Sequence, residues 1–267
     1  MRSHQTNPSP PSGAERLGEV GESPSMPTSP SHAFGVGPSL SSPWAEREFH
    51  LNESGYAVAP ALLIPTECAA LAARYDDAAQ FRSRVVMARH NFGRGEYQYF
   101  RYPLPEPVAD LRAALYPPLA AIANRWQEKM DVAARFPAAH ADFLARCHDA
   151  GQTRPTPLLL RYGAEDYNCL HQDLYGEHVF PIQATVLLSA PGRDFTGGEF
   201  ILTEQRPRMQ SRAEIVPLGQ GDAVFFAVNQ RPVRGTRGYY RVTMRHGVSR
   251  IRAGHRMTLG LIFHDAR

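Results

Sequence analysis

His171 and Asp173 are separated by a single residue in the segment NCLHQD, residues 168–173. We expect this segment to be a strand, in which side chains two residues apart point to the same face. An imidazole and a carboxylate on one face can bind the same metal ion. The spacing alone predicts only a candidate pair, because so short a pattern also occurs by chance.

The sequence itself contains such a chance match. His140 and Asp142 have the same spacing, but they lie in a segment that we expect to be helical. Side chains two residues apart on a helix point about 200° apart around its axis, so they do not meet at one ion. We therefore interpret His171 and Asp173 as the candidate metal pair and His140 and Asp142 as a coincidence.

His246 is the candidate third ligand. It closes a predicted strand, YYRVTMRH, and four predicted strands separate it from Asp173. A chain folded across two sheets can therefore return His246 to the side of the first pair. Two His and one carboxylate on one face of an octahedron leave three open positions, an arrangement that suits iron(II) in non-haem oxygenases.

Arg256 begins the next predicted strand, RMTLGLIF. A buried guanidinium forms two parallel hydrogen bonds to a carboxylate, and 2-oxoglutarate carries a carboxylate beyond its metal-chelating end. Arg252 is the alternative, but it lies in the predicted turn before Gly254. We expect Arg256 to bind 2-oxoglutarate, which would make this an iron(II) site that uses 2-oxoglutarate as cosubstrate.

Strands must position these side chains, and residues 155–267 supply eight candidates. They are short runs bounded by Gly, Pro and Asp, a pattern typical of a sandwich or barrel. Eight antiparallel strands in two sheets form a jelly roll. The predicted strands are TPLLLRY, NCLHQD, PIQATVLLS, GGEFILT, AEIVPL, GDAVFFAV, YYRVTMRH and RMTLGLIF.

The chain before these strands divides into two regions. Residues 1–43 are rich in Ser, Pro and Gly and have almost no apolar periodicity, which predicts a disordered tail. Residues 44–154 show helical spacing, and we expect their helices to brace one face of the jelly roll. Pro117 and Pro118 should break or kink the second of these helices. The expected helices run from Pro65 to Ala79, from Glu106 to Met130 and from Pro137 to Gly151.

Composition argues against several classes of protein. The chain has 267 residues and 43% hydrophobic content, with no long apolar run and no apolar segment at its amino terminus. Neither a membrane span nor a secretory signal is predicted, and we expect a cytoplasmic protein. The three cysteines, Cys68, Cys147 and Cys169, are odd in number and lack CxxC spacing. We expect buried reduced thiols rather than a disulfide framework.

The charge is unevenly distributed, although the net charge is only +3. Residues 206–267 contain twelve Arg against three acids. This excess favours an anionic partner such as nucleic acid. Solvated arginines on the outer faces of strands would give the same pattern, and net charge argues only for non-specific attraction.

Four segments of residues 158–264 together resemble the iron(II) and 2-oxoglutarate dioxygenases, whose core is a double-stranded β-helix, or jelly roll. The resemblance implies iron ligation by His171, Asp173 and His246, with Arg256 and Tyr162 holding 2-oxoglutarate. It also implies dioxygen as a cosubstrate and succinate and carbon dioxide as products. The segments are LLLRYGAEDYNCLHQD, FTGGEFIL, LGQGDAVFF and RHGVSRIRAGHRMTLGLIF.

The branch of this superfamily is less sharply defined. The order of the motifs resembles the prolyl-hydroxylase branch, whereas RYGAEDYNCLHQD resembles the AlkB branch that repairs alkylated nucleic acid. From about Phe49 onward the chain is similar to a bacterial oxygenase family described as acting on damaged DNA by oxidative demethylation. This similarity implies alkylated DNA or RNA as the substrate and a role in DNA repair.

Alternatives to this function remain. One is a protein side-chain hydroxylase of the prolyl type, and another is a non-catalytic jelly-roll module that only binds metal. An enzyme that takes a flipped base needs aromatic groups near its site. Five aromatic residues near the predicted site could serve this purpose, or they could belong to the core and the rim of the fold. The sequence does not specify the oligomeric state. The aromatic candidates are Tyr167, Tyr175, Phe180, Tyr239 and Tyr240.

Overall fold

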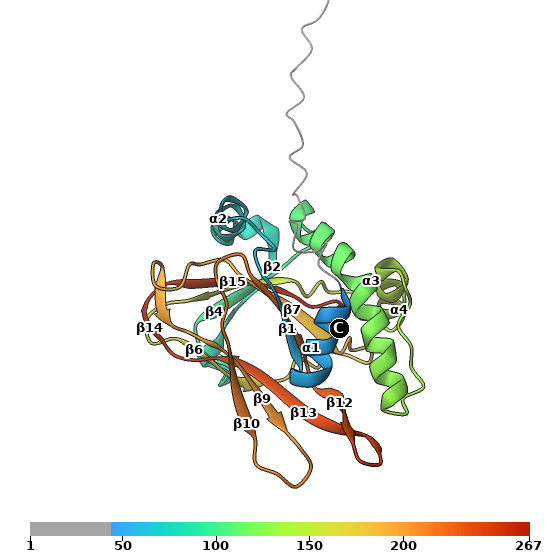
Figure 1. Ribbon diagram of the computed structural model, residues 1–267. Helices are drawn as coiled ribbons and strands as arrows, with labels where there is room; N and C mark the ends of the chain where they lie inside the picture. The colour runs from blue at the N-terminus through green and yellow to red at the C-terminus, as the bar shows by residue number, and fades with distance from the viewer. Residues whose placement is uncertain (1–43) are drawn as a thin grey trace, which may run out of the picture. The chain divides into compact units, whose positions relative to one another are not determined.

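The computed structural model describes residues 44–267, and the predicted disordered tail, residues 1–43, lies outside them. Two antiparallel sheets dominate these residues (Figure 1). The major sheet has the spatial order β1 (Tyr56–Ala59), β11 (Ala223–Ala227), β7 (Ile182–Leu187), β15 (Arg256–Leu261), β5 (Leu158–Tyr162), β4 (Glu96–Phe100) and β2 (Phe81–Val86). The minor sheet has the order β10 (Arg212–Val216), β9 (Phe200–Gln205), β13 (Gly238–Val248), β6 (Tyr167–His171) and β3 (Gly93–Arg94), with β12 (Gln230–Gly235) also paired to β13.

The predicted jelly roll is confirmed. All eight strands predicted in residues 155–267 are present, and they divide equally between the two sheets of a jelly roll: β5, β7, β11 and β15 lie in the major sheet, and β6, β9, β10 and β13 lie in the minor sheet. The sequence missed β12 and two short strands, β8 (Phe195–Gly197) and β14 (Ile251–Gly254), which pair with each other. Strands this short lack enough alternating residues to show a period of two.

Residues 44–154 are not helical throughout, so that part of the prediction was wrong. The expected helices are present, but the region also contributes β1, β2, β3 and β4. Three of these strands pair into the major sheet, β4 directly against β5. Long-range pairing of this kind fixes short Tyr-, Val- and Phe-rich runs as strands. The helices are α1 (Trp44–Ser54), α2 (Pro65–Ala73), α3 (Glu106–Lys129) and α4 (His140–Asp149).

Helix α3 is continuous through Pro117 and Pro118, so of the two expected effects, a break or a kink, the break is absent. Each proline removes one backbone hydrogen bond and strains the preceding turn. The helix survives because the same turns bury large side chains: Leu115, Tyr116 and Leu119 are all fully inaccessible to solvent. Full burial of one such apolar side chain contributes about 1.5–3 kcal/mol, so packing offsets the local cost.

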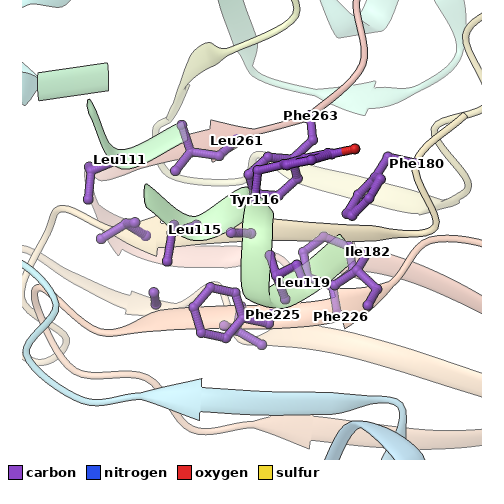
Figure 2. Close-up of a cluster of buried hydrophobic side chains, with 14 of the residues drawn as sticks. Leu111, Leu115, Tyr116, Leu119, Phe180, Ile182, Phe225, Phe226, Leu261 and Phe263 are labelled. Atoms are coloured by element: carbon purple, nitrogen blue, oxygen red, sulfur yellow. The ribbon is translucent and has the colours of Figure 1, made fainter. Parts of the chain in front are cut away.

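The face of the major sheet that points away from the minor sheet packs against α3. Figure 2 shows side chains of the helix meeting those of β7, β11 and β15 in one apolar cluster. The helices therefore brace one face of the jelly roll, as predicted, and hold the major sheet in place. The labelled residues are Leu111, Leu115, Tyr116, Leu119, Phe180, Ile182, Phe225, Leu261 and Phe263, together with Phe226, whose ring packs against His246 of the minor sheet.

The structure also bears on the predictions of buried, reduced cysteines and of a chain without a membrane span. All three cysteines are free, and Cys68 and Cys147 are buried as expected. Cys169 is exposed, contrary to expectation, and it is one of the residues that line the cavity described below. Within residues 44–267, no helix combines the length and the apolar character needed to cross a membrane.

His140, the histidine of the chance match, is part of the protein core. It is buried at the start of α4, where its Nε2 lies 2.8 Å from the Phe263 carbonyl oxygen and donates to it. Asp142 is exposed, and this pair is not part of the metal-binding group found among residues 44–267. Burial lowers the pKa of His140 to about 4, so the ring is neutral at physiological pH.

This depressed pKa predicts how stability depends on pH. The unfolded chain takes up a proton at residue 140 below about pH 6.5, whereas the folded protein does not until about pH 4. His140 therefore costs stability as pH falls through this window, by roughly 2 kcal/mol at pH 5. His140→Gln keeps a donor for the Phe263 carbonyl and does not titrate. Urea unfolding at pH 7 and pH 5 should show a smaller loss of stability for this variant than for the parent protein, and an equal loss would contradict a neutral buried His140.

Candidate active site

Two paired strands of the minor sheet bring the candidate metal ligands together. His171 ends β6 and lies directly opposite His246 of β13, and Asp173 follows two residues after His171. One carboxylate oxygen of Asp173 lies 3.4 Å from Nε2 of His171, and the other lies 3.4 Å from Nε2 of His246. All three ligand atoms lie within 4.8 Å of one another, close enough to hold one metal ion.

The electrostatics of these side chains are coupled. Burial opposes the charged form of Asp173, but its contacts with His171 and His246 outweigh burial and hold the pKa of the carboxyl well below its ordinary value. Burial likewise opposes protonation of His171, yet Asp173 raises its pKa overall. Burial, reinforced by the neighbouring His171, lowers the pKa of His246. The group therefore contains an ionised carboxylate between two imidazoles, a donor set suited to a divalent cation.

The rings are oriented by their surroundings. Nδ1 of His171 lies 2.8 Å from the Cys169 carbonyl oxygen and donates to it, which leaves Nε2 as the metal-binding atom. The ring of His246 packs against Phe226, with a centroid distance of 4.7 Å, and against Phe200 at 6.2 Å. A backbone acceptor and apolar packing thus fix both imidazoles before any metal binds.

Arg256 faces the same cavity from the major sheet. It is the first residue of β15, is 1% exposed and lies opposite Tyr162 in register. Its guanidinium carbon lies 5.7 Å from the ring centroid of Tyr162 and 5.9 Å from that of Phe195. Within residues 44–267, Nε and Nη1 of Arg256 have no hydrogen-bond partner. Arg252, the alternative, is exposed on β14.

The charge of Arg256 persists despite burial. Burial lowers its pKa to about 10, so the side chain is still a cation at neutral pH. A buried charge without full hydrogen bonding is costly, by several kcal/mol in proteins. Donors that point into a cavity without protein acceptors indicate an anionic ligand.

Gly198 makes room for Arg256. Its φ is +66°, and a Cβ added at this position would lie 2.3 Å from Ile251 Cδ1 and 3.0 Å from Arg256 Cδ. Any larger residue would displace the arginine or strain the backbone. The second glycine of the GGEF segment is therefore part of the support for the site.

One cavity of about 390 Å³ contains all five predicted site residues. The minor sheet and the segment that follows β6 supply His171, Asp173 and His246, and the major sheet supplies Arg256 and Tyr162. Apolar side chains separate these polar groups. They are Leu158, Leu160, Phe200, Val248 and Ile262.

The sequence missed most of the aromatic wall of this cavity. Tyr97 and Tyr99 of β4 line it together with Phe92, which precedes β3. The alternation in EYQYF was a usable signal, because it places both tyrosines on one face of a strand. Of the five aromatic candidates, only Tyr175 lines the cavity. Phe180 is buried in the core cluster, and the other three, Tyr167, Tyr239 and Tyr240, lie outside the cavity lining.

Comparison with solved structures supports the fold. A prolyl-4-hydroxylase of Pseudomonas putida has a TM-score of 0.50 at 16% identity, over 84% of this chain and 100% of that chain. A prolyl 4-hydroxylase of Phytophthora capsici has a TM-score of 0.49 at 17% identity, over 88% of this chain and 68% of that chain. The first of these likenesses shows that the chain has the prolyl-hydroxylase fold.

Comparison of sequences identifies the family. Two uncharacterised proteins of Mycobacterium tuberculosis are 52% identical to this chain over 167 residues, which cover 62% of this chain and 72% of each relative. The family model Oxygenase-NA, described as "Oxygenase, catalysing oxidative methylation of damaged DNA", matches residues 95–266. That match covers β4 to β15 and so includes every residue that lines the cavity except Asn91 and Phe92. The resemblance seen in the sequence is thereby confirmed: the chain belongs to the Oxygenase-NA family.

Proposed function

We propose that the protein is an iron(II)- and 2-oxoglutarate-dependent dioxygenase that hydroxylates its substrate and releases succinate and carbon dioxide. One observation carries this proposal. The buried cation Arg256, two of whose nitrogen atoms have no acceptor among residues 44–267, lies in the same cavity as a group of two His and one Asp. A metal site alone would not need the arginine, and an anion site alone would not need the three ligands.

The residues fit the metal that this function requires. His171, Asp173 and His246 offer two imidazole nitrogens and a carboxylate, and they leave three positions of an octahedron open. The three side chains line a cavity, which would leave space beside the metal for cosubstrate and substrate. Iron(II) bound here would activate dioxygen with electrons from 2-oxoglutarate, and it would insert oxygen into a substrate C–H bond.

The residues also fit the cosubstrate. Arg256 would hold the distal carboxylate of 2-oxoglutarate through paired hydrogen bonds, and Tyr162, opposite it in register, would complete that end of the site. The apolar side chains between the two ends exclude water from the region where the substrate would react. The cavity, at about 390 Å³, falls within the range of about 300–1,000 Å³ typical of small-molecule sites.

We propose alkylated nucleic acid as the substrate class, in agreement with the description of the family. Five exposed arginines of the minor sheet and its hairpins form no ion pair with any residue in 44–267 and are available for phosphates. Hydroxylation of an N-methyl carbon gives a hydroxymethyl group that leaves as formaldehyde, so the reaction would remove the alkyl group in a DNA-repair role. The arginines are Arg208, Arg212, Arg234, Arg237 and Arg245.

The catalytic unit, on this proposal, extends beyond the predicted core. Residues 155–267 would supply the metal ligands and the cosubstrate site. Residues 44–154 would complete the cavity through β4, whose Tyr97 and Tyr99 form one wall. We therefore propose that neither region is active without the other.

Metal binding is testable with a matched pair of variants. Asp173→Ala should abolish binding of one iron(II) or cobalt(II) ion per chain, because it removes the carboxylate between the two imidazoles. Asp142→Ala makes the same change in the chance match, on the exposed face of α4, and should bind metal as the parent protein does. Isothermal titration of anaerobic protein measures both. Normal binding by the Asp173 variant would refute the metal site.

The role of Arg256 is testable through the cosubstrate. Arg256→Gln should raise KM for 2-oxoglutarate by at least about 30-fold, since loss of one partner of a buried charge pair costs about 2 kcal/mol or more. Metal affinity should be unchanged. Arg252→Gln, the exposed alternative, should leave both quantities unchanged. A large effect at Arg252 with none at Arg256 would reverse the assignment.

The substrate class is testable by succinate release with iron(II), 2-oxoglutarate and dioxygen. We expect stimulation by oligonucleotides that carry N-methylated bases, with release of formaldehyde, and none by unmodified oligonucleotides or proline-rich peptides. Stimulation should weaken steeply with salt concentration, because phosphate contacts release counterions. Turnover on a peptide alone would favour a prolyl-type side-chain hydroxylase. Absence of turnover on every substrate, with metal bound, would indicate a non-catalytic module.

A further inference from the structure

Tyr175 contacts the candidate metal ligand Asp173 directly. Its hydroxyl donates a hydrogen bond of 2.8 Å to Oδ1 of Asp173, the oxygen that also lies 3.4 Å from Nε2 of His171. The other oxygen, Oδ2, faces His246. The carboxylate of Asp173 is therefore contacted by three side chains. His171 and His246 are candidate metal ligands themselves, whereas Tyr175 is not.

A second tyrosine, Tyr99 of β4, lines the same cavity as Tyr175. The guanidinium carbon of Arg82 lies 4.4 Å from the ring centroid of Tyr99.

The loop that carries Tyr175 is held by a buried side chain from the region before the jelly roll. Gln152, just after α4, is fully buried. Its Nε2 donates to the carbonyl oxygens of Tyr175 at 3.3 Å and His178 at 3.1 Å, and also to that of Asp265 at 2.6 Å. Its Oε1 accepts from the backbone nitrogens of Glu177 at 2.9 Å and His178 at 2.7 Å. One amide group thus fixes the backbone on both sides of residue 176.

Gly176 permits this arrangement. Its φ is +92°, and a Cβ added here would lie 2.4 Å from Cδ of Gln152. Only glycine combines this backbone conformation with the close approach of the amide. The segment DLYG therefore contains two residues, Tyr175 and Gly176, that shape the surroundings of Asp173 although neither could bind the metal in its place.

We propose that Tyr175 is a positioning residue for the metal-binding carboxylate: its hydroxyl holds Asp173 in the orientation in which both imidazoles face it, and Gln152 holds the loop that presents the hydroxyl. The inference rests on the proposed function, because it takes Asp173 to be a metal ligand. A carboxylate without this hydrogen bond would rotate more freely, and ordering it would oppose metal binding. Loss of such an outer partner typically lowers metal affinity about 10- to 100-fold.

The test compares two variants that remove one hydroxyl group each. Tyr175→Phe deletes the donor to Asp173. Tyr167→Phe makes the same change on β6, at a side chain that is 38% exposed and outside the cavity lining. Anaerobic apo-protein is titrated with iron(II) and with cobalt(II) by calorimetry, and the thermal unfolding of the metal-free proteins is recorded. We expect metal affinity to fall about 10-fold or more for Tyr175→Phe and to stay unchanged for Tyr167→Phe.

Each outcome bears on the proposal. Unchanged affinity in Tyr175→Phe overturns it. So does a loss of affinity that Tyr167→Phe matches, since the effect would then not depend on contact with Asp173. A lower unfolding temperature of the metal-free Tyr175→Phe protein with normal metal affinity would show a structural role only and would also overturn it. Asp173→Ala separates this inference from the proposed function, because normal metal binding by that variant refutes the metal site itself.

Discussion

The register between β6 and β13 is the constraint on which the rest of the site depends. His171 and His246 face each other across these strands, and their rings lie 4.1 Å apart between centroids. A slip of one residue would turn His246 to the outer face of the sheet and place the exposed Arg245 in the cavity. The slip is prevented from the other side of β13, where β9 pairs His246 with Leu202, a residue buried in the core. The candidate metal site is thus fixed by strand pairing and core packing, independently of any bound metal.

The second half of the site comes from the opposite sheet, so its geometry depends on how the two sheets are held. Arg256 and Tyr162 lie in neighbouring strands of the major sheet, whose far face is covered by α3. The apolar cluster on that face buries Leu115, Tyr116 and Leu119 of α3 completely, although the helix contains two prolines. Hydrophobic packing on the other side of the same sheet therefore offsets the free-energy cost of burying Arg256 with incomplete hydrogen bonding. This division lets the cavity stay polar and open while the fold remains stable.

Much of this could be predicted from the sequence, for identifiable reasons. The strands after Pro155 show a period of two, and strand context separates His171 and Asp173 from His140 and Asp142, which the structure places on a helix. The parts that could not be predicted depend on pairing between distant segments. The alternation in EYQYF indicates a strand, but it does not show that β4 joins β5 and forms one wall of the cavity. The sequence around Cys169 likewise does not show that this side chain is exposed at the cavity. Periodicity reports which face of an element is apolar, but it does not report which element covers that face.

Tyr175 and Gln152 illustrate the same limit at the level of single side chains. Neither has a spacing that signals chemistry, and they are separated by the whole of β5 and β6. Their roles become visible only in the folded chain, where Gln152, just after α4, hydrogen-bonds to the backbone of the loop that follows Asp173. A metal ligand is restricted in type by coordination chemistry, so it can be found from a motif. The groups that orient it need only donate one hydrogen bond from the right place, and many residue types on many elements can do so. The orientation of Asp173 is for this reason a property of the fold, whereas its identity as a carboxylate is a property of the local sequence.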